Sequence, residues 1–149
     1  MVVIRAARME DLDALAHLFD LYRIFYGKAS DVEEAKKFLS QRIRDKESVI
    51  YVADDEKNLL GFTQLYPQFS STRMKRSWLL NDLFVLKEHR QRGISKLLIE
   101  RAKNLALKTG AAGILLETDK SNQVGNRLYL SKGFVLNDKS NFYWWEYTQ

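Results

Sequence analysis

Hydrophobic residues recur with two different periods along the chain, and the period predicts which segments are helices and which are strands. Residues 2–7, VVIRAA, have the composition of a strand. In residues 9–27 apolar residues recur every three or four positions, which predicts a helix that ends at Gly27. Ser30 and Glu33 then have the spacing of a capping box, and apolar residues continue at helical spacing after them. The N-terminal third is therefore expected to be a strand followed by two helices.

The middle of the chain has the apolar pattern of strands. SVIYVAD and LLGFTQLYPQF flank the polar residues DEKN, which is typical of a hairpin, and KRSWLLNDLFVL is a longer strand. A helix is predicted from about Gly93 to Thr109, with Gly110 ending it. The rest is read as a short strand GILLET, a helix SNQVGNRLYLSK that ends at Gly133, and two closing strands, FVL and NFYWWEY.

This order of elements predicts the fold class. Strands LLNDLFVL and GILLET lie on either side of one helix, so they form a βαβ crossover and a parallel pair. Strands joined by short turns should be antiparallel. We expect an α/β (α+β) protein with a mixed, twisted sheet of six or seven strands flanked by helices. No linker interrupts the chain and Pro67 is the only proline, which predicts one domain over residues 1–149.

Composition excludes several kinds of chemistry. The chain has no cysteine, which excludes disulfides and thiolate sites, and only two histidines, so no metal site is expected. No apolar run approaches the about 20 residues that cross a bilayer, and the N-terminus does not resemble a secretory signal, so we expect a cytoplasmic protein without a membrane partner. The net charge of +5 favours an anionic partner.

The turn HRQRGIS, residues 89–95, is a candidate anion site. It lies between a predicted strand and helix, where the first backbone N–H groups of the helix have no intrahelical acceptor and the helix dipole favours an anion. Arg90, Arg92 and Lys96 add positive charge, and Gly93 leaves room for a ligand to approach the backbone. The pattern indicates a phosphate or diphosphate, with a solvated basic loop as the alternative. Neither a dinucleotide fingerprint nor a P-loop is present.

Two motifs resemble those of the GNAT superfamily of N-acetyltransferases. RQRGIS is similar to the R/Q-x-x-G-x-G/A loop of that family, with serine at the last position. SNQVGNRLYLSKGF is similar to the N-x-x-A-x-x-L-Y-x-x-x-G-F motif, carried by Asn122, Leu128, Tyr129, Gly133 and Phe134, with Gly125 in place of alanine. NDLFV also resembles a stretch of the diamine acetyltransferase branch, in which a glutamate stands where this chain has Asn81.

The resemblance implies the GNAT fold, with a parallel strand pair that splays apart, and acetyl-CoA as the donor without a metal. The diphosphate is expected at the loop, and the pantetheine arm along the splayed strand, with Asn122 bonding to its amides. The expected coenzyme-binding residues are thus Leu83, Phe84, Val85, Arg90, Gln91, Arg92, Gly93, Ile94, Ser95, Lys96 and Asn122.

Acetyl transfer to an amine requires proton transfers. A primary amine has a pKa of about 10.4, so a base must take its proton at neutral pH. Asp82 is the carboxylate on the central strand and the main candidate base, and Glu117 is a second. By resemblance, Tyr129 faces the coenzyme sulfur and protonates the leaving thiolate. Alternation along a strand predicts that Asn81 and Asp82 lie on opposite faces.

The resemblance implies that the first two helices wall the acceptor site. Tyr22, Phe25 and Tyr26 line the acceptor pocket in one interpretation and pack on the sheet in another, and Asn81 is also a candidate acceptor contact. NFYWWEY is rich enough in aromatic residues to pack the last strand and to form a homodimer contact. The predicted function is transfer of acetyl from acetyl-CoA to a primary amine of a small molecule or peptide in a ternary complex. The alternatives are an acyl-CoA sensor without turnover or a basic nucleic-acid-binding module.

Overall fold

The structure, a computed structural model, describes residues 1–148, which form two compact units. The first runs from Met1 to Glu117 and contains one sheet with strand order β1-β2-β3-β4-β5. The first four strands are antiparallel, and β5 is parallel to β4, as predicted for the crossover. The elements of this unit are β1 (Val3–Ala6), η1 (Met9–Asp11), α1 (Leu12–Phe25), α2 (Val32–Arg44), β2 (Val49–Asp54), β3 (Leu59–Ser70), β4 (Lys75–Val85), η2 (Lys87–His89), α3 (Ile94–Lys108) and β5 (Ile114–Leu116).

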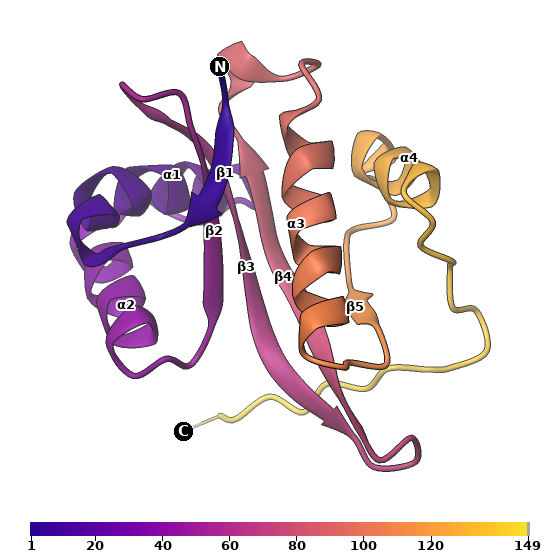
Figure 1. Cartoon of the computed structure of the whole chain (residues 1–149). Helices are drawn as coiled ribbons and strands as arrows, with labels where there is room; N and C mark the ends of the chain where they lie inside the picture. Colours follow the sequence, from indigo (N-terminus) through magenta and orange to yellow (C-terminus); the bar gives the residue numbers. More distant parts are fainter. Residues whose placement is uncertain (149) are drawn as a thin grey trace. The chain divides into compact units, whose positions relative to one another are not determined.

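The sheet of the first unit has a hydrophobic core on each face. Figure 1 shows α1 and α2 on one side of the sheet and α3 on the other. Leu15 and Leu39 bring α1 and α2 onto Val52 and Phe62 of the sheet, and all four side chains are fully buried. On the other face, Leu98 of α3 and its neighbours pack on the opposite side chains of the same strands. Helical periodicity on one side of each helix and alternation along each strand produce these two layers.

The connection between α1 and α2 differs from the predicted capping box. The N-cap of α2 is Asp31, whose side chain accepts a hydrogen bond from the Glu34 N–H at 3.2 Å. Ser30 instead donates its hydroxyl to Asp20 Oδ2 at 2.7 Å, and the Asp31 N–H donates to Asp20 Oδ1 at 2.7 Å. The buried Asp20 therefore anchors the residues that link the two helices, a long-range contact that local spacing did not predict.

A β-bulge at Asn81 changes the alternation along β4. The register passes from Gln64 opposite Asp82 to Leu65 opposite Leu80, so Asn81 has no partner on β3. Leu80 therefore packs in the core under α3, whereas Phe84, also even-numbered, packs in the core under α1 and α2. Without the extra residue, Asp82 would lie on the α3 face with Leu80. The bulge thus turns Asp82 toward the face that carries α1 and α2.

The parallel pair is short and then opens. β4 pairs with β5 only from Trp78 to Leu80, opposite Ile114 to Leu116. Beyond Leu80, β4 continues to Val85 beside β3 alone. The predicted splayed pair is therefore present, and it opens at the bulge.

The second unit, from Thr118 on, contains α4 (Gln123–Ser131). Asn122 caps this helix, since its Oδ1 accepts from the Gly125 N–H at 3.1 Å. A Cβ at position 125 would require the Asn122 side chain to shift from its capping position. The predicted strands FVL and NFYWWEY are wrong for the described residues, because no backbone ladder joins either segment to another strand. Aromatic residues favour strands, but a strand forms only where its backbone finds a partner.

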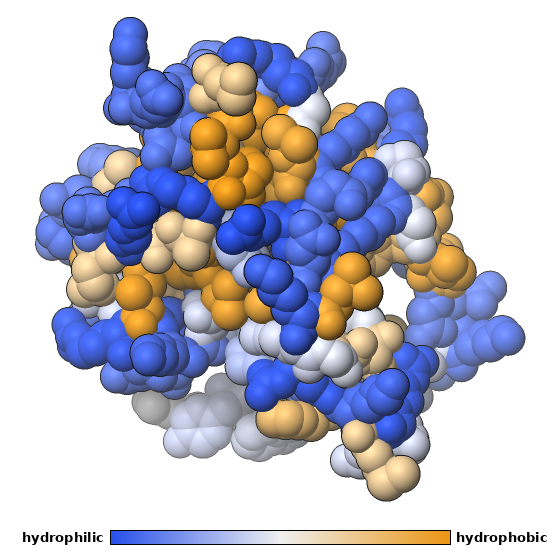
Figure 2. All heavy atoms as spheres, viewed as in Figure 1, coloured by the Kyte–Doolittle hydropathy of each residue, from blue (hydrophilic) through white to orange (hydrophobic). Residues whose placement is uncertain are grey.

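Figure 2 shows one face of the molecule, where hydrophilic residues predominate and separate hydrophobic groups lie between them. Across residues 1–148, none of the helices is long and apolar enough to cross a membrane.

Candidate functional site

Asp82 lies at the centre of a buried polar network where β4 leaves β5. Its side chain is on the α1 and α2 face and the residue is only 2% exposed. Gln64 Nε2 donates to Asp82 Oδ2 at 2.6 Å, and Asn81 Nδ2 donates to Asp82 Oδ1 at 2.9 Å. The side chains of Asn81 and Asp82 thus contact each other, because the bulge removes the strict alternation that placed them on opposite faces.

The environment of Asp82 favours a proton on its carboxyl group. Burial raises the pKa of Asp82 above its ordinary value, and hydrogen bonds from Gln64, Tyr22 and Asn81 oppose this increase. No lysine, arginine or histidine among residues 1–148 forms an ion pair with it. A buried carboxyl without a cation, held by neutral donors, is suited to accept and release a proton.

The aromatic end of α1 lies beside this network. The Tyr22 hydroxyl donates to the Asn81 carbonyl oxygen at 3.1 Å, and its ring lies edge-on to Phe84, with centroids 6.4 Å apart. Tyr26 contacts both Tyr22 and Phe25, with centroid distances of 5.1 and 5.2 Å. Tyr22 packs into the core, whereas Phe25 is 56% exposed and Tyr26 39% exposed. Tyr22 therefore packs on the sheet, and Phe25 and Tyr26 form an accessible surface, while the role of these rings toward an acceptor stays a prediction.

Arg90 connects the basic loop to these rings. Its Nε donates to the Val85 carbonyl oxygen at 2.9 Å, and its guanidinium lies 5.7 Å from the Phe25 centroid and 5.4 Å from that of Phe84. Arg92 is oriented differently, with Nη1 2.8 Å from His89 Nδ1. Of the two loop arginines, Arg90 therefore lies against the aromatic end of α1.

The loop before α3 has room for a ligand at the helix N-terminus. Gly93 is the N-cap, with φ of 78°, and no side chain caps the first turn. That turn contains no acidic residue, although it includes Lys96, which is unfavourable near the positive end of a helix dipole. A Cβ at Gly93 would meet no atom of the described residues within 4 Å. An open approach, uncapped N–H groups and excess positive charge together fit a diphosphate.

The predicted pantetheine segment has both free and occupied backbone groups. Leu83, Phe84 and Val85 lie in the part of β4 that has no β5 partner, as a ligand that replaces a strand would require. The Val85 carbonyl oxygen is already bonded to Arg90, and the Asp82 carbonyl oxygen accepts from Thr63 Oγ1 at 2.8 Å. Of the remaining loop residues, Gln91 has a φ of 62° and Ser95 lies in the first turn of α3. Ile94 is buried and anchors the loop to the core.

Two predicted site residues belong to the second unit. Asn122 caps α4, and its Nδ2 donates to Thr118 Oγ1 at 3.0 Å. Tyr129 is in α4, and its ring lies edge-on to Phe134 with centroids 5.9 Å apart. The roles of both residues toward the coenzyme stay predictions from the motif.

The basic residues that a nucleic-acid-binding module would use lie in two separate groups. Arg73, Lys75 and Arg76 lie at the turn that begins β4, whereas Lys87, Arg90 and Arg92 follow its end. Residues 77–85 of β4 separate the two groups, which corresponds to about 30 Å of strand. Positive charge is therefore divided between two sites, and only the second is at a helix N-terminus.

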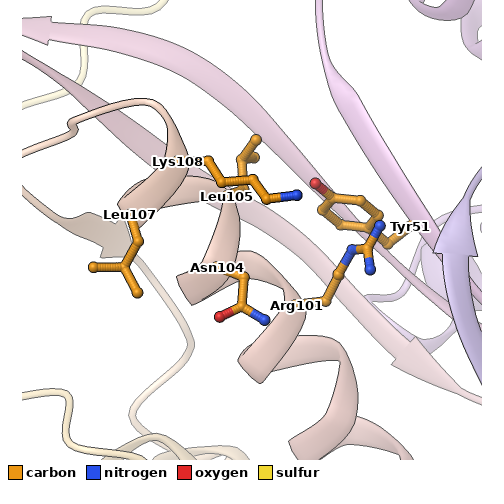
Figure 3. A pocket seen from close by; sticks show the side chains of 6 residues that line it. All are labelled: Tyr51, Arg101, Asn104, Leu105, Leu107 and Lys108. Atoms are coloured by element: carbon orange, nitrogen blue, oxygen red, sulfur yellow. The ribbon is translucent and has the colours of Figure 1, made fainter.

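A pocket of about 310 Å³ lies elsewhere, at the last turns of α3. Figure 3 shows its lining side chains, Tyr51, Arg101, Asn104, Leu105, Leu107 and Lys108. None of them is a predicted site residue, and the pocket has no carboxylate. Glu117, the second candidate base, is exposed at the end of the first unit. Within residues 1–148, no group of three or more acidic or histidine side chains could hold a metal ion.

Sequence reasoning missed the side chains that support Asp82. Gln64 and Thr63 are both fully buried on β3, and Ser48 Oγ donates to Gln64 Oε1 at 2.7 Å. The available signal was the polar pair TQ inside the otherwise apolar strand LLGFTQLYP. Adjacent polar residues inside a buried strand need partners, which indicates a polar network there.

Comparisons with known proteins agree with this arrangement of strand, loop and helix. Residues 15–134 match the family model described as the acetyltransferase (GNAT) family. The chain is 44% identical over 131 residues to YhfO, an uncharacterized N-acetyltransferase of Bacillus subtilis, with 88% of each chain covered. It is 35% identical to a probable acetyltransferase of Haemophilus influenzae over 92% of each chain. A crystal structure of a probable acetyltransferase aligns with a TM-score of 0.92 at 43% identity over 99% of both chains. With its splayed parallel pair and its glycine-capped basic loop, this chain is an acetyltransferase of the GNAT family.

Proposed function

We propose that the enzyme transfers the acetyl group of acetyl-CoA to a primary amine of a small molecule or peptide by direct attack in a ternary complex. The observation that carries this proposal is the buried Asp82 carboxyl, without a cation partner, at the bulge where β4 leaves β5. Acetyl-CoA supplies an activated thioester, and the family generally uses it. The reaction forms a C–N bond and breaks a C–S bond, so the protein must take one proton and give one.

Coenzyme binding is assigned to the loop and to the open part of β4. The N–H groups at the start of α3 would donate hydrogen bonds to the diphosphate, with Arg92 and Lys96 adding charge and Gly93 leaving space. Backbone groups of Leu83 and Phe84 would bind the pantetheine arm, and Asn122 its amides. Arg90 would add positive charge to the coenzyme site, since its guanidinium lies against the rings of Phe25 and Phe84 beside the loop.

Proton transfer is assigned to Asp82 and Tyr129. Asp82 would take the amine proton through a bridging water, because a residue that is 2% exposed cannot itself contact a solvated acceptor. Tyr129 would donate a proton to the departing sulfur. Burial raises the pKa of Asp82, and a base with a raised pKa is a better match for proton transfer near neutral pH.

The acceptor side is assigned to Tyr22, Phe25, Tyr26 and Asn81. The rings of Phe25 and Tyr26 offer an accessible apolar surface, and Arg90 places a cation next to Phe25. A cation at this surface opposes polycationic acceptors through like-charge repulsion. We therefore favour a monoamine with an apolar group, and a polyamine is disfavoured.

The family assignment removes the alternative of a nucleic-acid module as the principal function, and the divided basic groups do not support one. We propose a single N-acetyltransferase domain, because the match to the family model runs through both compact units. We also propose a homodimer, supported by the exposed aromatic residues near the C-terminus. A cytoplasmic location stays a prediction.

The decisive experiment is release of free thiol from acetyl-CoA across a library of primary amines. We expect amine-dependent release with at least one acceptor, and a large loss of kcat in Asp82→Asn with acetyl-CoA binding retained. Acetyl-CoA binding without amine-dependent release by any member of the library would favour the sensor. Full turnover by Asp82→Asn would instead exclude Asp82 as the base.

A further inference from the structure

The buried network around Asp82 continues away from β4 and ends at Ser48. Gln64 lies opposite Asp82 in the register of β3 and β4 and is fully buried. Its Nε2 donates to Asp82 Oδ2 at 2.6 Å, while its Oε1 accepts from Ser48 Oγ at 2.7 Å. Ser48 is half-buried and immediately precedes β2. Three side chains from three segments therefore form one hydrogen-bonded series.

The ionised carboxylate of Asp82 sets the order of donors and acceptors in this series. A glutamine amide has a donor end and an acceptor end, and a hydroxyl directed at the acceptor end leaves the donor end for the other partner. A carboxylate can only accept, so it pairs with the amide N–H, whereas a protonated carboxyl can also donate to the amide oxygen. A hydroxyl can donate or accept, so the ionised Asp82 carboxylate is the group that selects this amide orientation, and Ser48 then donates to the Gln64 oxygen.

We propose that Ser48 and Gln64 are positioning residues that set the proton affinity of Asp82, with the Ser48 hydroxyl polarising the Gln64 amide whose N–H bonds to the carboxylate. This inference rests on the proposed role of Asp82 in proton transfer. Gln64 is the first of the hydrogen-bond donors that lower the pKa of Asp82 against the increase caused by burial. Losing the Ser48 hydroxyl would leave the buried Gln64 oxygen without its donor and weaken the bond from the Gln64 amide N–H to the ionised carboxylate, which favours the protonated carboxyl.

Few other charged or titratable groups face Asp82. Tyr22 comes from α1 and lowers the pKa of Asp82 by hydrogen bonding. Tyr66 on β3 has its own pKa raised to about 12, by burial first and then by the charge of Asp82. Arg42 and Glu47 lie near Tyr66 and pair with each other, with Nε and Oε1 3.1 Å apart. Neutral donors rather than ion pairs therefore control Asp82.

The test is an NMR titration of the Asp82 carboxyl carbon in the full chain without substrate. Ser48→Ala should raise the pKa of Asp82 by up to about one unit, the effect of losing a whole neutral hydrogen bond, because the bond from Gln64 to the carboxylate is weakened and not removed. Ser48→Thr keeps a hydroxyl and should restore the wild-type value. Gln64→Glu should raise the pKa further, because two carboxyls would share one site. Ser77→Ala, on β4 outside the network, is the control and should change nothing.

The same variants are then assayed for kcat/KM against pH. If Asp82 is the base, the rise of kcat/KM should move to higher pH in Ser48→Ala by the shift that NMR measures. An unchanged Asp82 pKa in Ser48→Ala would overturn the inference, whatever Gln64→Glu does. A shifted pKa without a shifted rate profile would support the positioning and instead refute Asp82 as the base. If no variant has activity, the NMR result still decides the inference.

Discussion

At the scale of residues, the proposed role of Gly93 in coenzyme binding can be separated from its role in the folded backbone. It combines a positive φ of 78° with open space where a Cβ would lie, at the uncapped start of α3. Gly110, at the other end of the same helix, also has a positive φ, of 65°, and open space. Both positions therefore carry the same backbone cost for a side chain, and only one faces the proposed coenzyme site.

Replacing each glycine by alanine separates the backbone cost from coenzyme binding. Gly93→Ala and Gly110→Ala should each lower the free energy of unfolding by about 1–2 kcal/mol, the cost of the left-handed conformation. Only Gly93→Ala should also weaken CoA binding, by about tenfold or more, because its Cβ occupies ligand space. Urea denaturation and calorimetry measure the two effects. Equal CoA affinity in both variants would refute the loop assignment.

Tyr129 is tested by removing its hydroxyl alone. Tyr129→Phe should lower kcat by about a hundredfold, a typical contribution of a general acid, with little change in the KM for acetyl-CoA. Tyr143→Phe changes an exposed tyrosine of the same unit and should leave kcat unchanged. Steady-state rates at several pH values provide the comparison. A rate equal to wild type across that range would show that Tyr129 is not the acid.

At the scale of elements, the position of α1 matters because its last turns carry the acceptor rings. Asp20 holds the link that follows these turns through the Asp31 N–H and the Ser30 hydroxyl. These bonds lower the pKa of Asp20, with the Asp31 N–H as the larger cause. A group with a lowered pKa in the folded state stabilises that state above its unfolded pKa, and the contribution disappears as pH falls through the folded value.

Asp20→Ala should therefore reduce the free energy of unfolding at neutral pH by about 2 kcal/mol, as expected for lost hydrogen bonds to a charged group. The difference from wild type should shrink below the unfolded pKa of about 3.9. Ser30→Ala removes one of the two bonds and should have an intermediate effect. Denaturant unfolding between pH 7 and pH 3 provides the measurement. A difference that is independent of pH would contradict the charge-based account.

The secondary structure of the first unit follows local patterns closely. Helical spacing predicted α1, α2 and α3, and the hairpin residues DEKN joined β2 and β3 as expected. Patterns failed where partners are distant in sequence. Ser30 has the spacing of a cap but bonds to Asp20, and NFYWWEY has strand composition without a ladder in the described residues. Propensity describes what a segment prefers, and partners decide what it forms.

At the scale of the whole molecule, the aromatic residues near the C-terminus favour association. Phe142, Tyr143, Trp144, Trp145 and Tyr147 are each at least 70% exposed. Aromatic side chains bury about 150–250 Å² each, so five of them approach the about 800 Å² per partner of a stable interface. Exposed apolar area of this size is typical of interaction sites.

The homodimer is tested with a double substitution, Trp144→Ser with Trp145→Ser. The wild-type protein should sediment as a dimer, with about twice the 17.4 kDa mass of the chain, and the variant should sediment as a monomer. Loss of two large rings from the contact removes enough apolar area to account for dissociation. Sedimentation velocity at micromolar concentration distinguishes these states. A monomeric wild-type protein would refute the dimer.

The sequence by itself determined the helices and strands of the first unit, the crossover and the basic loop with Gly93, because each depends on spacing between near neighbours. It also identified the family, through two short motifs with Arg90 and Tyr129. Only the tertiary structure decided which way Asp82 faces and what surrounds it. A one-residue bulge at Asn81 reverses the alternation, Gln64 bonds to Asp82 from a different strand, and Ser48 bonds to Gln64. Register and burial are properties of paired strands, so no local pattern contains them.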